Sequence, residues 1–366
     1  GELVRYAVIG LGHIAQVAVL PAFANARRNS ELVALVSGDD DKLRKLGRKY
    51  RVPHAVSYDE LGRLIEENLI DAAYVALPND LHHEAVVQLA NAGIHVLCEK
   101  PLGVTERECR EMIDVARARN VLLMTAYRLH FDSATLAAVE TVRSGKIGEA
   151  RHFTSTFTMQ VTDEDNIRLS AERGGGPLYD LGVYCINAAR MLFESEPVEV
   201  MGMMASRDDP RFDEVPEMVT AVMRFPGERI ASFTCGFGSA DTSQYRIVGT
   251  KGDLVVEPAY EYAEGLAHRL TIDGKVTRKK YAKKDQFGPE LIAFSDAILG
   301  GDSSFPTGEE GLADVRIIRA IAQSAIEGMA LELPPMRPPP RPDRSQEMRL
   351  PAVRKPEEIK ARSPSS

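Results

Sequence analysis

The sequence lacks any run of about 20 apolar residues, so we expect no membrane-spanning helix. It has only four cysteines, whose spacing matches no metal site and whose apolar neighbours are typical of reduced core residues. We therefore expect no bound metal. Basic residues are fewer than acidic ones: the chain has 45 Lys and Arg and 53 Asp and Glu, and its net charge is −8. This charge argues against a nucleic-acid-binding surface.

The N-terminus shows none of the three parts of a signal peptide, namely a basic start, an apolar stretch and a cleavage site. For this form of the protein we expect no signal peptide and a cytoplasmic location. What the chain does have is an ordinary globular composition, with 44% hydrophobic and 27% charged residues. Its length of 366 residues suits two domains with additions.

Residues 1–126 alternate apolar strand patterns with amphipathic helix patterns, which predicts an α/β domain with a doubly wound parallel sheet. The expected strands are Val4–Ile9, Glu31–Val36, Ala72–Leu77, His95–Cys98 and Val121–Ala126. The expected helices are Ile14–Arg27, Lys42–Tyr50, Tyr58–Asn68, His82–Asn91 and Thr105–Arg119.

Residues 127–333 follow a different pattern, in which long strands succeed one another with few helices between them. This order predicts an α+β second domain built on a large, mostly antiparallel open sheet. Its expected strands are Arg151–Met159, Val198–Ala205, Met218–Phe225, Arg229–Phe237, Tyr245–Val248, Leu254–Glu257 and His268–Asp273. Its expected helices are Ser133–Arg143, Pro177–Phe193, Glu290–Leu299 and Glu309–Glu327.

Residues 334–366 form a tail that is rich in proline and arginine and has few apolar anchors, so we expect it to be extended or disordered. The tail holds eight Lys and Arg against four Asp and Glu, which leaves the rest of the chain with a net charge of −12. One hypothesis places this basic tail along its acidic body or along a neighbouring subunit. A solvated tail is the alternative.

A glycine-rich turn follows the first expected strand: Gly10-Leu11-Gly12-His13-Ile14-Ala15. Between a strand and a helix, this G-x-G-x-x-G/A pattern predicts a dinucleotide-binding Rossmann domain. Gly10 permits the tight turn, Gly12 lets a pyrophosphate approach the backbone, and the amides at the helix start hold the phosphates. We expect His13 and Ile14 to contact the cofactor at the same turn. A glycine turn that only joins a strand to a helix is the alternative.

The end of the second expected strand bears on the choice between NADP and NAD. NAD enzymes usually place an acidic residue here, whereas this chain has Ser37 and Gly38, followed by Lys42. A serine hydroxyl can donate to a 2′-phosphate, and a lysine can attract it. We therefore expect NADP, with these three residues in its site. An inward-turned Asp39 would favour NAD instead, and Ser37 with Asp39 can also serve only as a helix cap.

Two further segments end strands of the expected parallel sheet, where such sheets bind their ligands. Leu77-Pro78-Asn79 and His82 end one strand, and we expect all four residues to contact the cofactor; a helix cap is the alternative role of Asn79, and His83 is expected on the outer face. Glu99-Lys100-Pro101 ends the next strand. We expect Glu99 and Lys100 near the cofactor, and we expect Lys100 to manage the proton during hydride transfer at a carbon that bears oxygen. A cis bond before Pro101 would position the Lys100 ammonium.

In the second domain three glycines, residues 174–176, lead into an expected helix that carries Asp180 and Tyr184. Because these two residues are four apart, they share one helical face, and Asn187 follows one turn later. Glycines before a helix let a domain approach a ligand closely. We expect Asp180 and Tyr184 to be catalytic. The alternative is a structural helix start at which Asp180 only offsets the helix dipole.

Together with Tyr127-Arg128-Leu129-His130-Phe131, these motifs make residues 3–333 resemble the glucose–fructose oxidoreductase / inositol dehydrogenase (Gfo/Idh/MocA) family, and most closely its glucose–fructose oxidoreductase-like branch. Tyr184 and Asn187 stand where inositol dehydrogenase-like members carry histidine and aspartate, which speaks against an inositol-type substrate. The resemblance implies homodimers or homotetramers formed through the second-domain sheet. It also implies a substrate site made of Lys100, Arg128, His130, Arg168, Asp180 and Tyr184, with Arg128 also near the cofactor.

The implied activity is oxidation of a sugar hydroxyl, at the anomeric carbon of an aldose. The hydride goes to NADP, and the proton goes to Tyr184 or is shared with Lys100. Three alternatives stay open: coupled oxidoreduction of two sugars on tightly held NADP, reduction of a keto-sugar, and a nucleotide-sensing regulator on the same fold. The sequence identifies neither the sugar nor the direction of the reaction.

Overall fold

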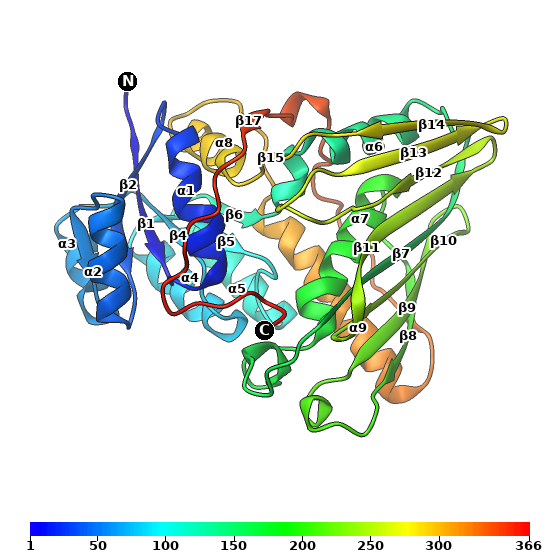
Figure 1. Ribbon diagram of the computed structural model, residues 1–366, viewed down its shortest axis with the longest axis horizontal. Coiled ribbons are helices and arrows are strands. Elements are labelled where there is room, and N and C mark those ends of the chain that lie inside the picture. Colours follow the sequence, from blue (N-terminus) through cyan, green and yellow to red (C-terminus); the bar gives the residue numbers. More distant parts are fainter.

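Six parallel strands form the first sheet of the computed structural model, which describes residues 1–366 (Figure 1). Their order is β3-β2-β1-β4-β5-β6, and every neighbouring pair is parallel. The strands are β1 Val4–Ile9, β2 Ser30–Val36, β3 His54–Val56, β4 Ala72–Val75, β5 His95–Glu99 and β6 Leu123–Ala126. The expected doubly wound sheet is confirmed. Its order reverses between β1 and β4, which is where such sheets bind ligands.

Helices cover both faces of this sheet, because its strands are apolar on both sides. One face packs against η1 Ala15–Val19, α1 Leu20–Ala22, α2 Asp40–Lys49 and α8 Gly288–Ile298. The other face packs against α3 Leu61–Glu66, α4 His82–Asn91, α5 Glu106–Ala118 and the start of α9 Gly308–Glu327. Since α8 and α9 come from the C-terminal third of the chain, the two domains are interleaved in sequence.

The first helix differs from the continuous helix expected over residues 14–27. It begins as a π-helical turn, passes through the single α-helical turn of α1 and ends as a 3-10 turn at Phe23–Asn25. Pro21 accounts for the difference, because it has no N–H to donate to the carbonyl four residues before it. The helix start is regular, since the N–H of Gln16 donates to the carbonyl of Gly12 over 3.1 Å.

Nine strands form the second sheet, in the order β14-β13-β12-β11-β7-β10-β9-β8-β16. They are β7 Ala150–Gln160, β8 Glu199–Ala205, β9 Met218–Phe225, β10 Arg229–Gly236, β11 Gly238–Gly249, β12 Gly252–Val256, β13 Ala267–Ile272, β14 Lys275–Lys280 and β16 Leu331–Glu332. Only β7 and β10 pair in parallel, so the expected mostly antiparallel sheet is confirmed.

The inner face of this sheet packs against α6 Ser133–Arg143, α7 Val183–Phe193 and α9, which lie between the two sheets (Figure 1). No helix covers the outer face, on which Met201, Met203, Met218 and Val222 are exposed. All four cysteines are buried and unpaired, as expected of reduced core residues. No helix has both the length and the apolar character that crossing a membrane requires.

The tail, residues 334–366, is extended and lies against the body of its own chain, as one of the two hypotheses expected (Figure 1, orange to red). Its strand β17, Leu350–Pro351, pairs with β15, Lys284–Asp285. The N–H of Met348 donates to the carbonyl of Phe131 over 3.2 Å. Backbone pairing therefore holds the tail in place despite its few apolar residues.

A buried arginine joins the helices of the second domain. Arg190 on α7 is fully buried, and its guanidinium binds Glu196 at 2.7 Å, Glu310 at 2.7 Å and Asp314 at 2.9 Å. Glu310 and Asp314 lie on α9, which also packs on the first sheet. The network therefore sets the position of α7 relative to the Rossmann domain. Such groups are costly to bury and depend on one another.

Replacing Arg190 by Met should destabilise the protein strongly, because it leaves Glu310 and Asp314 buried without their cation. We expect a loss of about 3–5 kcal/mol in the free energy of unfolding, measured by urea denaturation. The control is Arg224→Met, which removes a half-exposed arginine from surface pairs with Glu199 and Glu228 and should have little effect. Equal losses in the two variants would contradict a structural role of the buried network.

Candidate active site

A cleft of about 1010 Å³ lies between the two sheets, at the carboxyl ends of β1, β4, β5 and β6. Its far wall comes from β7, from the turn η7 Leu178–Gly182 that precedes α7, and from the segment that follows β12. The lining includes most of the predicted site residues: Gly10, Gly12, His13, Ile14, Ser37, Lys42, Leu77, Pro78, Asn79, His82, Glu99, Lys100, Arg128, Arg168, Asp180 and Tyr184. Gly38 and His130 are outside it.

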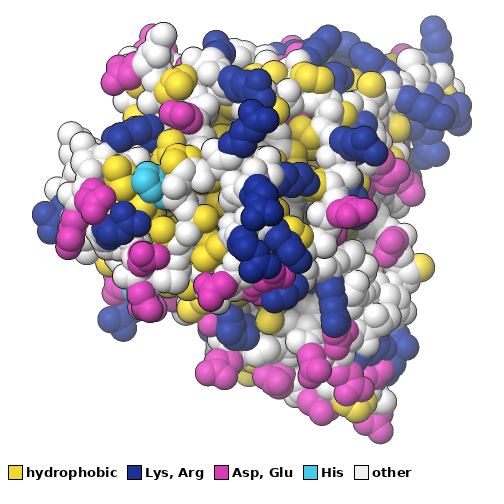
Figure 2. All heavy atoms as spheres, turned by 60° about the vertical axis from the view of Figure 1, so that its left-hand side comes forward, with side chains coloured by type: hydrophobic (Ala, Val, Ile, Leu, Met, Phe, Trp, Pro, Cys, Tyr) yellow, Lys and Arg dark blue, Asp and Glu magenta, His cyan; other side chains and the backbone are white.

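Positive charge is concentrated in this cleft although the chain as a whole is acidic. Ten Lys and Arg side chains line it, against five Asp and Glu. The cations are Lys42, Lys100, Arg128, Arg168, Arg173, Lys283, Lys284, Lys355, Lys360 and Arg362, and the acids are Glu99, Asp180, Asp241, Glu261 and Asp285. Figure 2 shows Lys and Arg side chains gathered in a band down the middle of one face of the molecule. A cleft of this charge suits an anionic ligand such as a dinucleotide.

The glycine turn after β1 has the geometry that a pyrophosphate needs. Gly10 has a φ of +93°, and a Cβ there would lie 2.5 Å from the carbonyl oxygen of Ala76, so only glycine fits. A Cβ on Gly12 would meet no atom within 4 Å, because the space beside it opens into the cleft. The helix start beyond it offers backbone N–H groups to an anion. These residues fit a dinucleotide.

At the end of β2 the structure separates the two roles that the sequence left open. The carboxylate of Asp39 caps α2, accepting the N–H groups of Asp41 at 3.0 Å and Lys42 at 3.1 Å, and it does not line the cleft. Ser37 and Lys42 do line it, and the Lys42 ammonium has no carboxylate partner. Gly38 packs on Tyr58. A serine and a free ammonium, with the acid turned away, fit a 2′-phosphate.

Lys100 follows β5, and its bond to Pro101 is cis, as the sequence predicted. Its ammonium donates to the backbone carbonyl of Asp180 over 3.0 Å and lies 4.6 Å from the ring centroid of Tyr184. Lys100 from the first domain therefore meets the helix start of the second domain, as the motifs predicted.

The Asp180 carboxylate pairs with Arg168 at 3.1 Å, not with Lys100. Asp180 therefore holds Lys100 through its backbone carbonyl, which lies in the π-helical turn η7, and not through its carboxylate. The carboxylate is left to its pair with Arg168. Arg168 and Asp180 form a separate ion pair in the cleft lining.

Tyr184 lies between two cations. Arg128, from η5 Arg128–Phe131, donates to the Tyr184 hydroxyl over 3.0 Å, and its guanidinium carbon lies 5.1 Å from the Tyr184 ring centroid. Arg128 also donates to the amide oxygen of Gln286 and to the carbonyl of Tyr260. Sequence patterns did not single out Gln286 or Tyr260, which belong to loops without a motif, although both line the cleft.

Two predicted histidines are hydrogen-bonded within the protein, His82 through both ring nitrogens and His130 through one. His82 is fully buried, with one nitrogen 2.8 Å from the carbonyl of Pro101 and the other 2.8 Å from that of Leu77, so it braces two loops of the cleft. His130 lies 2.8 Å from the amide oxygen of Asn187 and is buried behind the cleft. The structure does not bring His130 to the predicted sugar site.

Asn79 and His83, which lie near His82 in the sequence, also bind other parts of the chain. Asn79 does not cap α4; its amide donates to the carbonyl of Gly174 over 2.9 Å and so joins the two domains across the cleft. His83 lies 2.6 Å from Glu111 on the outer side of α4, as expected.

Two carboxyl groups lie near Lys100, the partly buried Glu99 and the fully buried Glu290. The hydroxyl of Tyr74 donates to Glu99 over 2.5 Å and lies 3.4 Å from Glu290, whose second carboxyl oxygen has no partner. Burial raises the pKa of Glu290 well above its usual range, and the charge of Glu99 raises it further. Burial also raises the pKa of Glu99, although the hydrogen bond from Tyr74 and the charge of Lys100 oppose it. We infer that Glu290 is the protonated member of this pair.

Glu290→Gln should therefore make stability less dependent on pH. The unfolded chain releases the Glu290 proton above about pH 4.5, whereas the folded chain keeps it, so stability falls as pH rises through this range. Glutamine removes this loss, which amounts to at most about 1.4 kcal/mol per pH unit. Thermal unfolding from roughly pH 5 to pH 8 measures it. Equal pH slopes in the wild type and the variant would contradict the assignment, and Glu84→Gln on the exposed side of α4 is the control.

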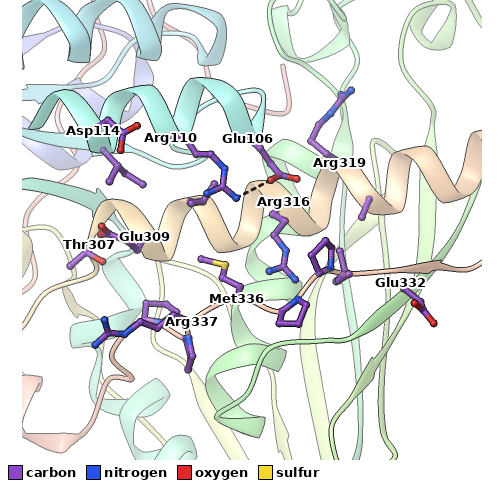
Figure 3. A pocket seen from close by; sticks show the side chains of 18 of the residues that line it. Glu106, Arg110, Asp114, Thr307, Glu309, Arg316, Arg319, Glu332, Met336 and Arg337 are labelled. Carbon is purple, nitrogen blue, oxygen red and sulfur yellow. Dashed lines mark hydrogen bonds and ion pairs between the residues drawn. The ribbon is translucent and has the colours of Figure 1, made fainter. Parts of the chain in front are cut away.

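A second cavity of about 1030 Å³ lies away from these residues, between α5, α9 and the proline-rich start of the tail (Figure 3). Arg316 on α9 points toward the prolines there and, although buried, has no hydrogen-bond partner at its Nε atom. Arg110, Met336 and Arg337 are among the other residues that line this cavity. None of the predicted site residues lines this cavity, and the start of the tail forms part of its wall.

Two family profiles match the chain. Residues 4–127 match an oxidoreductase family with an NAD-binding Rossmann fold, and residues 135–255 match the GFO/IDH/MocA C-terminal domain. Among curated proteins, D-xylose 1-dehydrogenase [NADP(+)] of Haloarcula marismortui is 31% identical over 329 residues, covering 88% of this chain and 91% of that protein. A dTDP-3,4-didehydro-2,6-dideoxy-alpha-D-glucose 3-reductase of Saccharopolyspora spinosa is 31% identical, covering 88% and 97%.

Solved structures show the same likeness. Aldose–aldose oxidoreductase from Caulobacter crescentus, solved with glycerol, is 34% identical with a TM-score of 0.86, covering 90% of this chain and 100% of that one. A 3-ketoreductase from Actinomadura kijaniata, solved with NADP and TDP-benzene, is 27% identical with a TM-score of 0.80, covering 88% and 98%. The likeness therefore spans both domains and the cleft between them.

Proposed function

Because the chain belongs to the GFO/IDH/MocA oxidoreductase family, we propose that it is an NADP-dependent sugar oxidoreductase. It transfers a hydride between the nicotinamide and C1 of an aldose. The observation that carries this proposal is the meeting of Lys100 and Tyr184 at the carboxyl edge of the Rossmann sheet, in the same cleft as the glycine turn. The NADP-dependent xylose dehydrogenases and the aldose–aldose oxidoreductase among its relatives support the substrate class.

NADP is the cofactor that the cleft suits. Ser37 and the unpaired Lys42 line the adenosine end, and the carboxylate of Asp39 is bound to the backbone of α2 instead. An inward carboxylate would repel a 2′-phosphate, and this chain offers none there. Relatives that bear NADP in their names or structures agree with this assignment.

Each residue of the site has a separate role in the proposed reaction. Lys100 and Arg128 face the Tyr184 ring from the two domains, and two cations at this place favour the phenolate form of Tyr184. The phenolate takes the sugar proton in the oxidation direction and so becomes the neutral phenol, which returns the proton when a sugar is reduced. The Lys100 ammonium also stabilises negative charge on the reacting oxygen. Arg168 and Asp180 offer a donor and an acceptor to the remaining sugar hydroxyls. The bound cofactor supplies the hydride acceptor or donor.

One alternative is favoured by a specific observation, the name of the aldose–aldose oxidoreductase among the similar structures. It is coupled oxidoreduction of two sugars, on cofactor that stays bound to this chain. Nicotinamide absorbance after mixing with excess NADP and a panel of aldoses separates the two. Continuous growth means exchangeable cofactor and identifies the sugar. A rise that ends near one equivalent per site means coupled turnover. No change with any aldose, NADP or NAD contradicts the proposal.

Lys100→Ala should lower kcat by roughly 10²–10⁴-fold, because it removes the cation that stabilises the transferred charge. Tyr184→Phe should cause a loss of similar order, since it keeps the ring and removes the proton acceptor. Both variants should still bind NADPH, which fluorescence titration measures, because the glycine turn is untouched. Lys146→Ala, an exposed lysine outside the cleft, is the control. A wild-type rate in Lys100→Ala would refute the assignment.

We also propose that two copies associate through the uncovered outer face of the second sheet. Met201 and Met203 of β8 and Val222 of β9 expose apolar side chains on that face, with Met203 73% exposed. An apolar face of this kind is typical of an interface between copies. Met203→Asp should convert the assembly to single chains, as light scattering would show. A wild-type protein with the mass of one chain would contradict the association.

A further inference from the structure

The end of the tail lines the cofactor cleft. Val353, Lys355 and residues 360–365 are among the lining residues, together with the glycine turn and Lys100. Figure 1 shows this segment, in red, crossing in front of α1 and β4 before it ends near the second domain. The sequence alone left the role of the tail open, and the proposed reaction uses none of these residues.

The tail reaches the cleft through successive anchors. Its prolines first lie along α9 and α5, where they form one wall of the second cavity (Figure 3). Arg341 then pairs with Glu196 at 3.3 Å, and β17 pairs with β15. The amide of Asn25 donates to the carbonyl of Pro351 over 2.9 Å. The last residues therefore arrive at the cleft already positioned by the rest of the chain.

At the cleft the tail binds the helix that follows the glycine turn. The side-chain amide of Gln16 donates to the carbonyl of Ile359 over 2.9 Å, and its oxygen accepts the Ile359 N–H over 2.7 Å. Glu358 lies 2.9 Å from His13, which is itself part of the glycine motif. The hydrogen bonds of Gln16 pair both backbone groups of one residue, as a strand would, so the register of the tail is defined here.

Lys360 lies at the adenosine end. Its ammonium is 3.4 Å from Asp39 and 3.8 Å from Asp41, at the start of α2, and it lines the cleft together with Ser37 and Lys42. Two lysines from distant parts of the chain therefore line the same cleft as the serine whose hydroxyl fits a 2′-phosphate. Each ammonium is a compact point charge that can attract an anionic group.

Beyond Lys360 the tail passes to the second domain. Arg362 pairs with Asp163 at 2.5 Å, and the amide of Asn166 donates to the carbonyls of Pro364 at 3.0 Å and Ser366 at 2.8 Å. Residues 358–366 thus contact both domains and span the cleft. A ligand between the domains lies under a segment that is bound on both sides.

The tail is about as long as the part of this chain that one similar structure leaves unmatched. The aldose–aldose oxidoreductase chain is matched over its whole length by 90% of this chain, which leaves about a tenth of this chain without a counterpart there. The tail, residues 334–366, is of that size.

We propose that residues 353–366 are part of the NADP site, with Lys360 contacting the 2′-phosphate and the segment retaining the cofactor between turnovers. This inference rests on the proposed function. Of the two forms of that function it favours the coupled one, in which one sugar gives up a hydride and a proton, a second sugar takes up both, and the cofactor returns to its starting state without leaving.

The test compares the full chain with a chain that ends at Ala352 and keeps the β17 pairing. Purified protein is passed over a desalting column, the NADP(H) that it retains is quantified after heat release, and the release rate of NADPH is followed by fluorescence after a chase with excess NADP. Because the chain has no tryptophan, the nicotinamide signal is not complicated by tryptophan emission. We expect the full chain to retain cofactor and the shortened chain to release it at least roughly tenfold faster.

Lys360→Ala separates the phosphate contact from the rest of the tail. It should lower the affinity for NADPH roughly tenfold and leave the affinity for NADH unchanged, because only NADPH carries the 2′-phosphate. The matched control is Lys45→Ala: Lys45 also pairs with Asp41, at 3.1 Å, and is about as exposed, but it does not line the cleft. Circular dichroism and melting temperature verify that each variant is folded.

The possible results separate the inference about the tail from the proposed function. Equal release from the full and shortened chains overturns the inference and leaves the proposed function standing. Faster NADPH binding by the shortened chain, with unchanged release, would make the tail a competitor of the cofactor and would also overturn it. If no form binds NADPH or NADP, the proposed function fails and the inference fails with it. An equal loss of NADPH and NADH affinity in Lys360→Ala overturns the phosphate contact.

Discussion

Lys100 and Arg128 approach the same phenol ring, with the Lys100 ammonium 4.6 Å and the Arg128 guanidinium carbon 5.1 Å from the Tyr184 centroid. Two like charges that approach one ring repel each other, more so in a half-buried site than in water. The arrangement holds because each cation has its own acceptor, the Asp180 carbonyl for Lys100 and the Gln286 amide for Arg128. These acceptors come from different segments, so the reacting group exists only when both domains and the interleaved C-terminal third are assembled.

Glu99, Glu290 and Arg190 stabilise the packing that brings Lys100, Arg128 and Tyr184 together. Glu99 is the last residue of β5, directly before Lys100, and its charge offsets that of the lysine. Glu290 on α8 shares the Tyr74 hydroxyl with Glu99. On the other side, the Arg190 network fixes α7, which carries Tyr184, against α9. The apolar cores bring the helices together, and these polar contacts set their register. The catalytic geometry is therefore a property of the helix packing rather than of the loop at the cleft alone.

Much of the fold follows from residue patterns, because the strand and helix periods are strong in both domains. The limits are physical. β14 is charged and fully exposed, with Lys and Arg at four of its six positions, so no alternation marks it as a strand. β16 and β17 are two-residue edge pairings that only the tertiary structure creates. Pro21 breaks a helix that apolar spacing alone predicts to be continuous.

The site shows a similar division. Motifs placed Lys100, Asp180 and Tyr184 in one cleft, but they did not reveal that Lys100 binds a main-chain carbonyl, since backbone acceptors leave no mark in a sequence. They also gave His130 a role at the sugar site, because a motif reports adjacency along the chain and not the side on which a ring points.

The composition of the tail indicates disorder, whereas the structure shows the tail ordered against the body of the chain. Proline and arginine with few apolar residues are typical of disorder, and taken alone the segment has no core to join. Its partners are instead the backbone of β15, the amide of Gln16 and the acids of α2, none of which lies near it in sequence. Fixed φ angles at the prolines lower the entropy that the segment loses on binding. A basic segment stiffened by prolines can therefore be ordered on an acidic protein. The end of this segment lies at the cleft, which is the part of the protein where positive charge is concentrated. Bringing more positive charge to such a cleft is unfavourable unless an anion is to lie between, which is the electrostatic condition that a bound dinucleotide phosphate meets.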